Sequence, residues 1–288
     1  MRELVILSGK GGTGKTTVAG ALAALWAGRA IFVDADVDAA NLHLLTRPER
    51  LATAPFAGGK LVIVDGDRCT GCGACTARCR FGAMENGRVR PVECEGCGLC
   101  AVVCPEGAVR LTERASGRWN LSRTAHGLLL DAELFPGEGN SGKLVSVLRD
   151  EGRKAAAREG VDRIVVDGPP GIGCPVMASL AGAHTVLAVA EPSVAGLHDL
   201  RRVLDLAAHF EFACVIAVNR ADVSPLFTRA VREEASRRGV PVLTEIPYDP
   251  AVNSCAAAGL PVTTCPESAA AGAIRLLAQG LDALFTVC

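Results

Sequence analysis

A glycine-rich stretch near the N-terminus has the composition of a phosphate-binding loop. The residues SGKGGTGKTT, at positions 8–17, follow the apolar run LVIL and match the pattern Gly-x4-Gly-Lys-Thr. In such a loop, backbone N–H groups turn toward a phosphate and the following helix adds its positive end. Lys15 then contacts the β- and γ-phosphates, and the Thr16 hydroxyl coordinates Mg²⁺. The predicted nucleotide-binding residues here are Gly9, Lys10, Gly11, Gly12, Thr13, Gly14, Lys15, Thr16 and Thr17.

Two runs of cysteine offer a different chemistry. Each run has the spacing Cys-x2-Cys-x2-Cys-x3-Cys that is typical of bacterial ferredoxins. Soft thiolates at this spacing favour a [4Fe–4S] cluster, and structural zinc, which generally uses two separated cysteine pairs, is the alternative. In two-cluster folds the fourth cysteine of each run binds the other cluster. The expected ligand sets are therefore Cys69, Cys72, Cys75 and Cys104 for one cluster, and Cys94, Cys97, Cys100 and Cys79 for the other.

Acidic residues follow two further apolar runs. In VDADVDAANLHLL, starting at residue 33, a carboxylate would stand beside the γ-phosphate and could orient a water molecule. In RIVVDGPPGIGCP, residues 163–175, Asp167 would hold Mg²⁺ through water and the Gly171 N–H would contact the γ-phosphate. Asp34 and Asp38 are weaker candidates, because either could be a helix cap or a solvated turn residue.

Short aliphatic runs that alternate with helical patterns must position these residues. Strands that are apolar on both faces, alternating with helices, predict an α/β fold with a doubly wound, mostly parallel sheet, as in P-loop NTPases. Ligands then bind beyond the carboxyl ends of the strands. The predicted strands are 4–7, 30–34, 163–168, 185–190 and 214–219, and the predicted helices are 15–28, 195–210 and 224–239.

Residues 58–117 interrupt this alternation. The segment contains cysteine, glycine and short strand patterns, and CTGCGACTARCRFGAM aligns without gaps to CEGCGLCAVVCPEGAV. We interpret residues 58–117 as a small inserted α+β domain of the bacterial ferredoxin type. Its host is then a discontinuous P-loop domain made of residues 1–57 and 118–288.

Composition excludes several classes of function. The chain has 288 residues and a formal net charge of -1, so no overall field favours nucleic acid or an anionic membrane. No run approaches the roughly 18 apolar residues of a membrane span, and the first apolar run is too short for a signal peptide. We therefore expect a cytoplasmic protein with neither a nucleic-acid partner nor a membrane span.

The stretch GKGGTGKTT resembles the deviant Walker motif of the MinD/ParA ATPases, a class that includes the nitrogenase iron protein. This resemblance implies a homodimer with nucleotide at the interface, in which Lys10 reaches the partner's phosphates as an arginine finger does. It also implies that Asp36 positions the attacking water. In AVNRAD, Asn219 would bind adenine, and in EIPYD the segment around Pro247 would flank the base. Either could be an ordinary strand end, and the residues alone do not exclude GTP.

Nearly the whole chain resembles MinD superfamily ATPases that contain an inserted ferredoxin domain, including the stretches NSGKLV (140–145), DGPPGIGCPV and EPSVAGLHDL (191–200). The leading hypothesis is an ATPase that uses ATP and Mg²⁺ to gate electron transfer from two [4Fe–4S] clusters to a partner. An ATP-dependent assembly factor or carrier for clusters is the second, and a positioning switch is the third. Cys174, seven residues after Asp167, matches a cluster ligand of the nitrogenase iron protein, with Cys255 or Cys265 as a second ligand, or it is a buried structural cysteine.

Overall fold

A computed structural model describes residues 1–287, with side chains described through residue 285. The chain divides into two compact units. The large unit consists of Met1–Thr53, Trp119–Glu133 and Ser141–Cys288, and the cysteine unit consists of Ala54–Arg118 and Leu134–Asn140.

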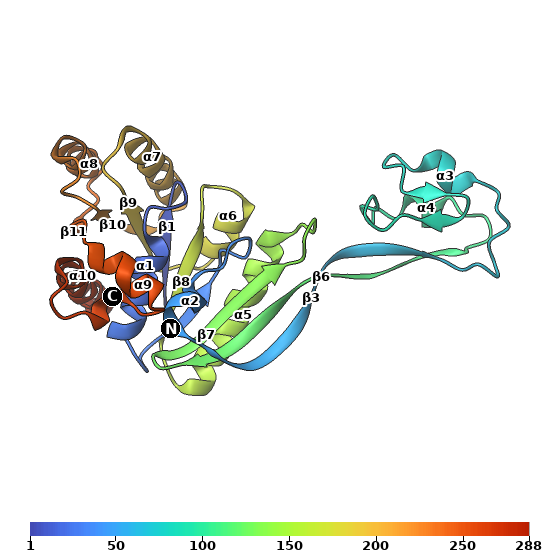
Figure 1. Cartoon of the computed structure of the whole chain (residues 1–288). Helices are drawn as coiled ribbons and strands as arrows, with labels where there is room; N and C mark the ends of the chain where they lie inside the picture. Colours follow the sequence, from blue (N-terminus) through green and yellow to red (C-terminus); the bar gives the residue numbers. More distant parts are fainter. Residues whose placement is uncertain (288) are drawn as a thin grey trace. The chain divides into compact units, whose positions relative to one another are not determined.

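A mostly parallel sheet forms the centre of the large unit (Figure 1). Its strands follow the order β11-β10-β9-β1-β8-β2-β7, and β6 and β3 continue it. The register is parallel for every neighbouring pair from β11 to β7, so the carboxyl ends of these strands share one edge. The parallel strands are β1 (Arg2–Ser8), β2 (Ile31–Asp34), β7 (Gly127–Leu134), β8 (Arg163–Pro170), β9 (Thr185–Ala190), β10 (Ala213–Asn219) and β11 (Val242–Ile246).

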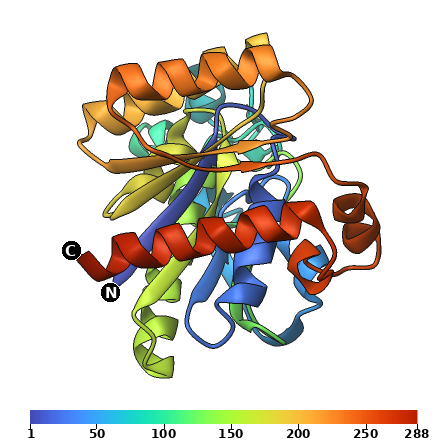
Figure 2. The ribbon, with the colours of Figure 1, turned by 90° about the vertical axis from the view of Figure 1, so that its left-hand side faces the viewer.

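Helices cover both faces of this sheet because its strands are apolar on both sides. On one face, Leu4 and Ile6 join a core that includes α1 (Lys15–Leu25) and α10 (Ala269–Val287). Side chains alternate along a strand, so Val5 and Leu7 face the other way. Figure 2 shows α10 lying across α1. The remaining helices of the large unit are α2 (Leu42–Thr46), α5 (Ser141–Glu159), α6 (Cys174–Leu180), α7 (Val194–His209), α8 (Pro225–Arg238), α9 (Pro250–Ala257) and the 3₁₀ turn η1 (Val262–Thr264).

The expected α/β fold with a large, mostly parallel sheet is confirmed. Each predicted strand overlaps an observed one, and 185–190 coincides with β9. The predicted helices end differently by a few residues: α1 stops at Leu25, where the Trp26 backbone leaves the helical region. Positions of the elements could be predicted because buried parallel strands leave an uninterrupted apolar signal.

The cysteine unit contains four short elements. They are α3 (Ala74–Arg78), α4 (Leu99–Val102) and the antiparallel pair β4 (Met84–Glu85) and β5 (Arg88–Val89). Two long strands, β3 (Glu49–Val64) and β6 (Val109–Thr124), begin in one unit and end in the other.

The expected domain boundaries at residues 58 and 117 both fall inside these long strands. Gly58 lies within β3, and a Cβ there would approach the side chains of Phe56 and Ser116 to within 3 Å. Gly58 therefore marks a close approach between paired strands rather than a turn. The expectation of short strands within 58–117 was wrong at both ends of the segment.

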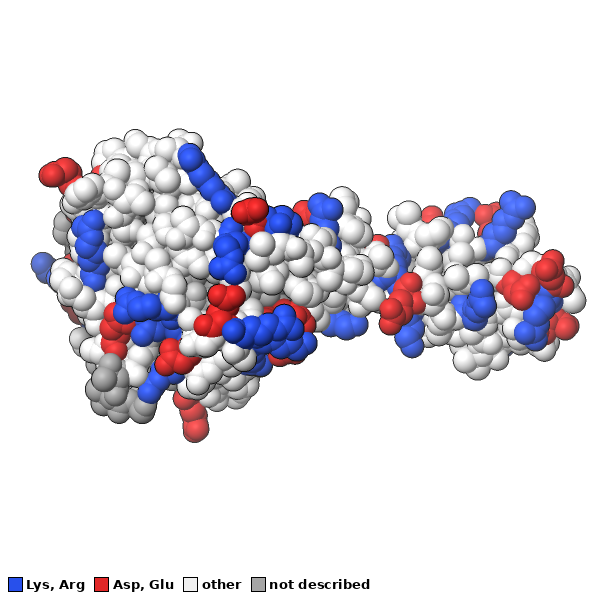
Figure 3. Space-filling view, turned by 90° about the horizontal axis from the view of Figure 1, so that it is seen from below, with Lys and Arg blue, Asp and Glu red and all other residues white. Residues whose placement is uncertain are grey.

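The surface carries charges of both signs. On the face shown in Figure 3, Lys and Arg side chains are interspersed with Asp and Glu, with no broad patch of one sign on either unit. No helix within residues 1–287 is both long enough and apolar enough to cross a membrane.

Candidate functional site

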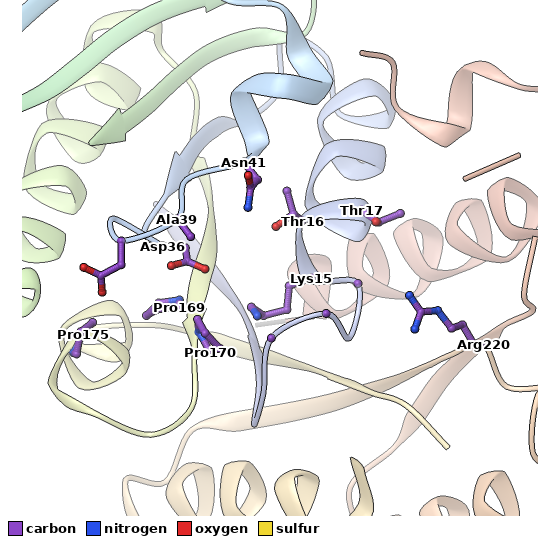
Figure 4. A pocket seen from close by; sticks show the side chains of 14 residues that line it. Lys15, Thr16, Thr17, Asp36, Ala39, Asn41, Pro169, Pro170, Pro175 and Arg220 are labelled. Carbon is purple, nitrogen blue, oxygen red and sulfur yellow. The ribbon is translucent and has the colours of Figure 1, made fainter. Parts of the chain in front are cut away.

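The shared carboxyl edge of the sheet brings together the loops that follow β1, β2, β8 and β10. These loops surround a cavity of about 580 Å³ in the large unit, within the size range of small-molecule sites. Figure 4 shows Lys15 between Asp36 on one side and Arg220 on the other. The lining residues are Gly11, Gly12, Gly14, Lys15, Thr16, Thr17, Asp36, Asp38, Ala39, Asn41, Pro169, Pro170, Pro175 and Arg220.

Lys15 is held at the first turn of α1 with its side chain 6% exposed. Its Nζ donates to Ser8 Oγ at 2.9 Å, and that hydroxyl donates to the Lys10 carbonyl at 2.7 Å. Burial lowers the pKa of Lys15, while nearby Asp167 and Asp36 act to raise it. The ammonium group thus lies against the loop. A bound phosphate there would compensate the Lys15 ammonium group for the water that it loses on burial.

Asn219, at the end of β10, supports the phosphate loop from the side. Its Nδ2 donates to the Thr13 carbonyl at 2.8 Å. The neighbouring Gly14 has a φ of 102°, and a Cβ there would lie 2.2 Å from Asn219 Nδ2. Glycine is therefore required at this position both by its backbone conformation and by the close approach of Asn219.

Asp167 is the buried carboxylate that most clearly suits a cation. Within the described part of the chain, neither of its oxygens accepts a hydrogen bond of normal geometry, although the Thr16 hydroxyl lies near enough to lower the pKa. Burial has the larger effect and raises the pKa of Asp167 to about 6. A buried carboxylate without partners is costly, and Mg²⁺ prefers oxygen ligands. The donor set of Asp167 and Thr16 therefore fits a hydrated magnesium ion.

The two other aspartates after β2 differ in their surroundings. Asp34 is fully buried and accepts the backbone N–H groups of Asn41 and Leu42, each at 2.9 Å. It therefore shapes the loop before α2, whose N-cap residue is Asn41. Asp36 lines the cavity, where burial raises its pKa and Lys15 acts in the opposite direction. Asp38 also lines the cavity.

Gly171 and Pro247 do not line the cavity that the phosphate-loop residues line. The Gly171 N–H donates to the Ser8 carbonyl at 3.1 Å, so contact with a phosphate would require that bond to open. Pro247 lines a second hollow of the large unit together with Asp222, whose Oδ1 accepts the Tyr248 N–H at 2.6 Å. The predicted residues that do not line the main cavity are Gly9, Lys10, Thr13, Asp167, Gly171, Asn219 and Pro247.

Lys10 forms an ion pair with Glu191, which follows β9. Their side chains are 36% and 17% exposed. Burial alone would raise the pKa of Glu191, but hydrogen bonds from Lys10 and Ser193 lower it below its usual value. Glu191 Oε2 also lies 3.9 Å from Arg220, which lines the cavity and has a positive φ of 56°.

The sequence analysis missed Glu191 and Arg220. Both lie directly beside predicted features, because Glu191 follows a predicted strand and Arg220 follows Asn219. Only the strand order, which places β9 next to β1, could have shown that Glu191 reaches Lys10.

The eight cysteines of the two runs line two separate cavities in the cysteine unit. Each cavity is lined by the four cysteines that were assigned together, so the fourth cysteine of each run lies with the other run. The Ala108 N–H donates to Cys104 Sγ at 3.3 Å, and a Cβ on Gly87 would lie 2.9 Å from Cys69 Sγ. The two sets are Cys69, Cys72, Cys75 and Cys104, and Cys79, Cys94, Cys97 and Cys100.

The cavities are lined by thiol groups, the donor type that zinc and iron–sulfur clusters both take. Among residues 1–287, no group of three or more His, Cys, Asp or Glu side chains is arranged to hold a metal ion. A single zinc ion would need four sulfurs about 2.3 Å from one point. An iron–sulfur core would take four thiolates of this kind as its ligands.

The remaining cysteine at a predicted site is Cys174. It is the first residue of α6 and is exposed, so the alternative of a buried structural cysteine is wrong. Cys255 and Cys265 contact each other at 2.9 Å between their Sγ atoms.

Comparison with known proteins identifies the family. The model of the CobQ/CobB/MinD/ParA nucleotide binding domain matches residues 4–262, and the chain belongs to this family. The uncharacterized protein MJ0578 of Methanocaldococcus jannaschii is 31% identical over 222 residues, which is 76% of this chain and 78% of that protein.

Solved structures show the same fold. The septum site-determining protein MinD from Pyrococcus horikoshii, complexed with Mg-ADP, matches with a TM-score of 0.61 and 21% identity, covering 98% of this chain and 96% of its own. Cobyrinic acid a,c-diamide synthase from Mycobacterium smegmatis, with an ATP analog and magnesium, matches with a TM-score of 0.51 and 17% identity over 100% and 96% of the two chains.

Proposed function

We propose that this chain is an ATP-binding and ATP-hydrolysing iron–sulfur protein, in which the nucleotide gates electron transfer from two [4Fe–4S] clusters to a partner protein. The observation that carries this proposal is the crossed arrangement of the cysteines. Each cavity is lined by three cysteines of one run and the fourth cysteine of the other, as two-cluster ferredoxins require. The cysteine unit is then a ferredoxin-type domain, with residues 58–117 as its inserted core, and 1–57 with 118–288 form the ATPase domain.

The ATPase half of the proposal rests on the cavity around Lys15. Lys15 and the N–H groups of the glycine loop bind the phosphates, Thr16 and Asp167 hold the hydrated Mg²⁺, and Asp36 orients the attacking water. Bound Mg²⁺ neutralises charge on the phosphates. The matched relatives solved with Mg-ADP or with an ATP analog and magnesium favour ATP as the nucleotide. Asn219 and Pro247 are proposed to contact the base.

Lys10 carries the proposal of a homodimer. Because Lys10 is paired with Glu191 at the rim and does not line its own cavity, its ammonium group is available to a partner's phosphates once that pair opens. Two copies would then enclose the nucleotides at their interface, as the deviant loop implies. The exposed thiols of Cys72 and Cys97 favour a reducing compartment, and we propose the cytoplasm.

The two cysteine sets would each hold one cluster, which supplies one-electron redox chemistry. The protein contributes hydrogen bonds and burial that tune the potential. The Ala108 N–H bonded to Cys104 Sγ and the buried positions of Cys75, Cys94 and Cys100 are such contributions.

Counting iron and labile sulfide in anaerobically prepared protein tests this function, together with an ATPase assay on the same sample. We expect about eight iron and eight sulfide atoms per chain, with Mg²⁺-dependent ATP hydrolysis. Zinc in place of iron, or iron without hydrolysis of any nucleotide, would overturn the proposal. The Cys174→Ser variant is the matched control and should keep all of its iron.

One observation favours a second function. Cys174 is exposed at the start of α6, directly before the lining residue Pro175, and is placed to take part in a labile cluster site. The chain would then assemble or carry clusters for other proteins in an ATP-dependent manner. Transfer of iron to an apo-ferredoxin that requires ATP and is lost in Cys174→Ser would favour this alternative, whereas closed four-thiolate sites should retain their iron.

A further inference from the structure

Two cysteines outside the cluster cavities lie in contact. Cys255 is in α9, Cys265 follows η1, and their Sγ atoms are 2.9 Å apart. A disulfide bond is about 2.05 Å long, so the sulfur atoms need to approach by only about 0.9 Å. The two residues are ten apart in sequence, so a bond between them would close a short loop.

The two thiols differ in access to solvent. Cys255 is 5% exposed, whereas Cys265 is partly exposed. The hydrogen bond shared with Cys265, together with burial, raises the pKa of Cys255 to about 11. Cys265 is therefore the thiol that a dissolved disulfide reaches first, and Cys255 is placed to react second.

The segment that contains both cysteines is anchored at its two ends by one carboxylate. Asp249 accepts the Ala251 N–H at the start of α9, and its other oxygen accepts the Ser268 hydroxyl at 2.6 Å and the Ala270 N–H at 3.2 Å. Immediately before Asp249 are Pro247 and Tyr248, which belong to the proposed base-binding edge.

The same segment contacts α1, the helix that begins at Lys15, and Arg47, the residue after α2. The Thr263 hydroxyl donates to the Ala21 carbonyl in α1 at 3.2 Å, and the Arg47 guanidinium, just after α2, donates to the Ala258 carbonyl. A crosslink inside this segment would therefore restrict a part of the large unit that contacts both α1 and the residue following α2.

We propose that Cys255 and Cys265 form a reversible disulfide, a redox modification site that stiffens the segment from Asp249 to Ser268. One further consequence rests on the proposed ATP-binding function. The stiffened segment holds Pro247 and Tyr248 in place and thereby slows nucleotide release.

The oxidant is a low-molecular-weight disulfide of the glutathione class. The Cys265 thiolate attacks one sulfur of that disulfide, and the first small thiolate leaves. Cys255 then loses its proton and attacks Cys265 Sγ, and the second small thiolate leaves. Two protein thiols are oxidised, the small disulfide accepts the two electrons, and the two thiol protons end on the two small thiols.

Differential alkylation followed by mass spectrometry tests the bond. The holoprotein is incubated anaerobically in oxidised glutathione, quenched in acid and digested with trypsin, which leaves both cysteines in the peptide 239–275. We expect this peptide to lose two hydrogens and to resist alkylation, and dithiothreitol should restore two alkylated cysteines. A stable glutathione adduct on Cys265, or two free thiols throughout, would overturn the proposal. Cys214→Ser, which removes a different cysteine, should behave as wild type.

Native-state proteolysis tests the stiffening. Thermolysin cleavage within 256–264 should be at least fivefold slower after oxidation in wild type, and unchanged by oxidation in Cys255→Ser and Cys265→Ser. Equal cleavage rates before and after oxidation of wild type would contradict it.

Release of a fluorescent ATP analogue tests the consequence, with a slowing of at least threefold expected only in the oxidised wild type. Failure to bind any nucleotide would count against the proposed function, whereas binding with an unchanged release rate would count against this consequence alone. Peptide mapping decides on the disulfide in either case.

Discussion

The large unit and the cysteine unit fill their cores with different kinds of side chain. One core cluster of the large unit contains aliphatic and aromatic residues such as Leu4, Trp26 and Leu281, each with no exposed surface. The small core of the cysteine unit contains three of the predicted cluster ligands, Cys75, Cys94 and Cys100, among only seven buried residues.

This difference separates the causes of stability in the two units. Burial of apolar surface, at about 25 cal/mol per Å², stabilises the large unit without a ligand. A small core cannot do this alone, and small domains commonly depend on metals or crosslinks. We infer that the large unit folds independently of its nucleotide, whereas the cysteine unit would depend on the clusters proposed above.

The largest expected effect comes from Lys15→Ala. Loss of the buried ammonium group should reduce ATP hydrolysis by about 10²-fold or more, because preorganised charge acts on the phosphates in a site with little water. Iron content should not change if the two units fold independently. ATPase rates and iron counts measure both effects, and Lys154→Ala, at an exposed position on α5, is the control. A loss of iron together with the loss of ATP hydrolysis would contradict the inference that the two units fold independently.

Cys75→Ala removes a proposed ligand from the cysteine unit, as Lys15→Ala removes a proposed phosphate contact from the large unit. We expect roughly half of the iron to be lost, because one complete four-thiolate site is destroyed, and proteolysis within 58–117 should accelerate by an order of magnitude. Nucleotide affinity should stay within about twofold of wild type. The partly buried Cys214, replaced by Ser, serves as the control for losing a thiol elsewhere. Full iron content with normal protection would mean that Cys75 is not a ligand.

Asp36→Asn should separate binding from hydrolysis within the large unit. The amide cannot act as the carboxylate does in orienting water, so hydrolysis should fall by about 10- to 100-fold. Binding should change little, because Lys15 and the loop backbone remain. Single-turnover rates and ATP affinity measured on one preparation give both values. A loss of affinity that matches the loss of rate would assign Asp36 to binding instead.

Glu191→Gln should have the smallest effect. It removes the ion pair that holds Lys10 against its own chain, and a partly exposed pair is worth about 0.5–1 kcal/mol. ATP-dependent dimerisation should therefore strengthen by about two- to fivefold, as measured by analytical ultracentrifugation. Asp205→Asn, which alters the pair between Asp205 on α7 and Arg238 on α8, should leave dimerisation unchanged. Weaker dimerisation in Glu191→Gln would show that this carboxylate supports the dimer.

Local patterns made most of the large unit predictable. The phosphate loop, Asp36 and Asp167 all follow apolar runs, and a parallel sheet collects such strand ends at one edge. Strand order was not predictable, because it depends on pairing between distant residues. For that reason the contact of Lys10 with Glu191, 181 residues away in sequence, was missed.

Prediction from sequence was weaker for glycine and cysteine, because each of these residue types can have several structural roles. Residue 58 was predicted to begin the inserted domain, but Gly58 lies inside a strand, where the side chain of Ser116 approaches it closely. Cys255 and Cys265 belong to no spacing motif, and only the folding of α9 back toward η1 brings them together. The roles of the site residues and of the eight clustered cysteines stay predictions.

An anaerobic EPR redox titration of the Asp36→Asn protein, with and without Mg-ATP, tests most directly the claim that nucleotide gates electron transfer. This variant should bind ATP and hydrolyse it slowly, so the bound state persists during the titration. The account predicts that Mg-ATP shifts the midpoint potential of at least one cluster by about 59 mV or more, a tenfold change for a one-electron couple. Identical potentials and line shapes in both conditions would contradict it.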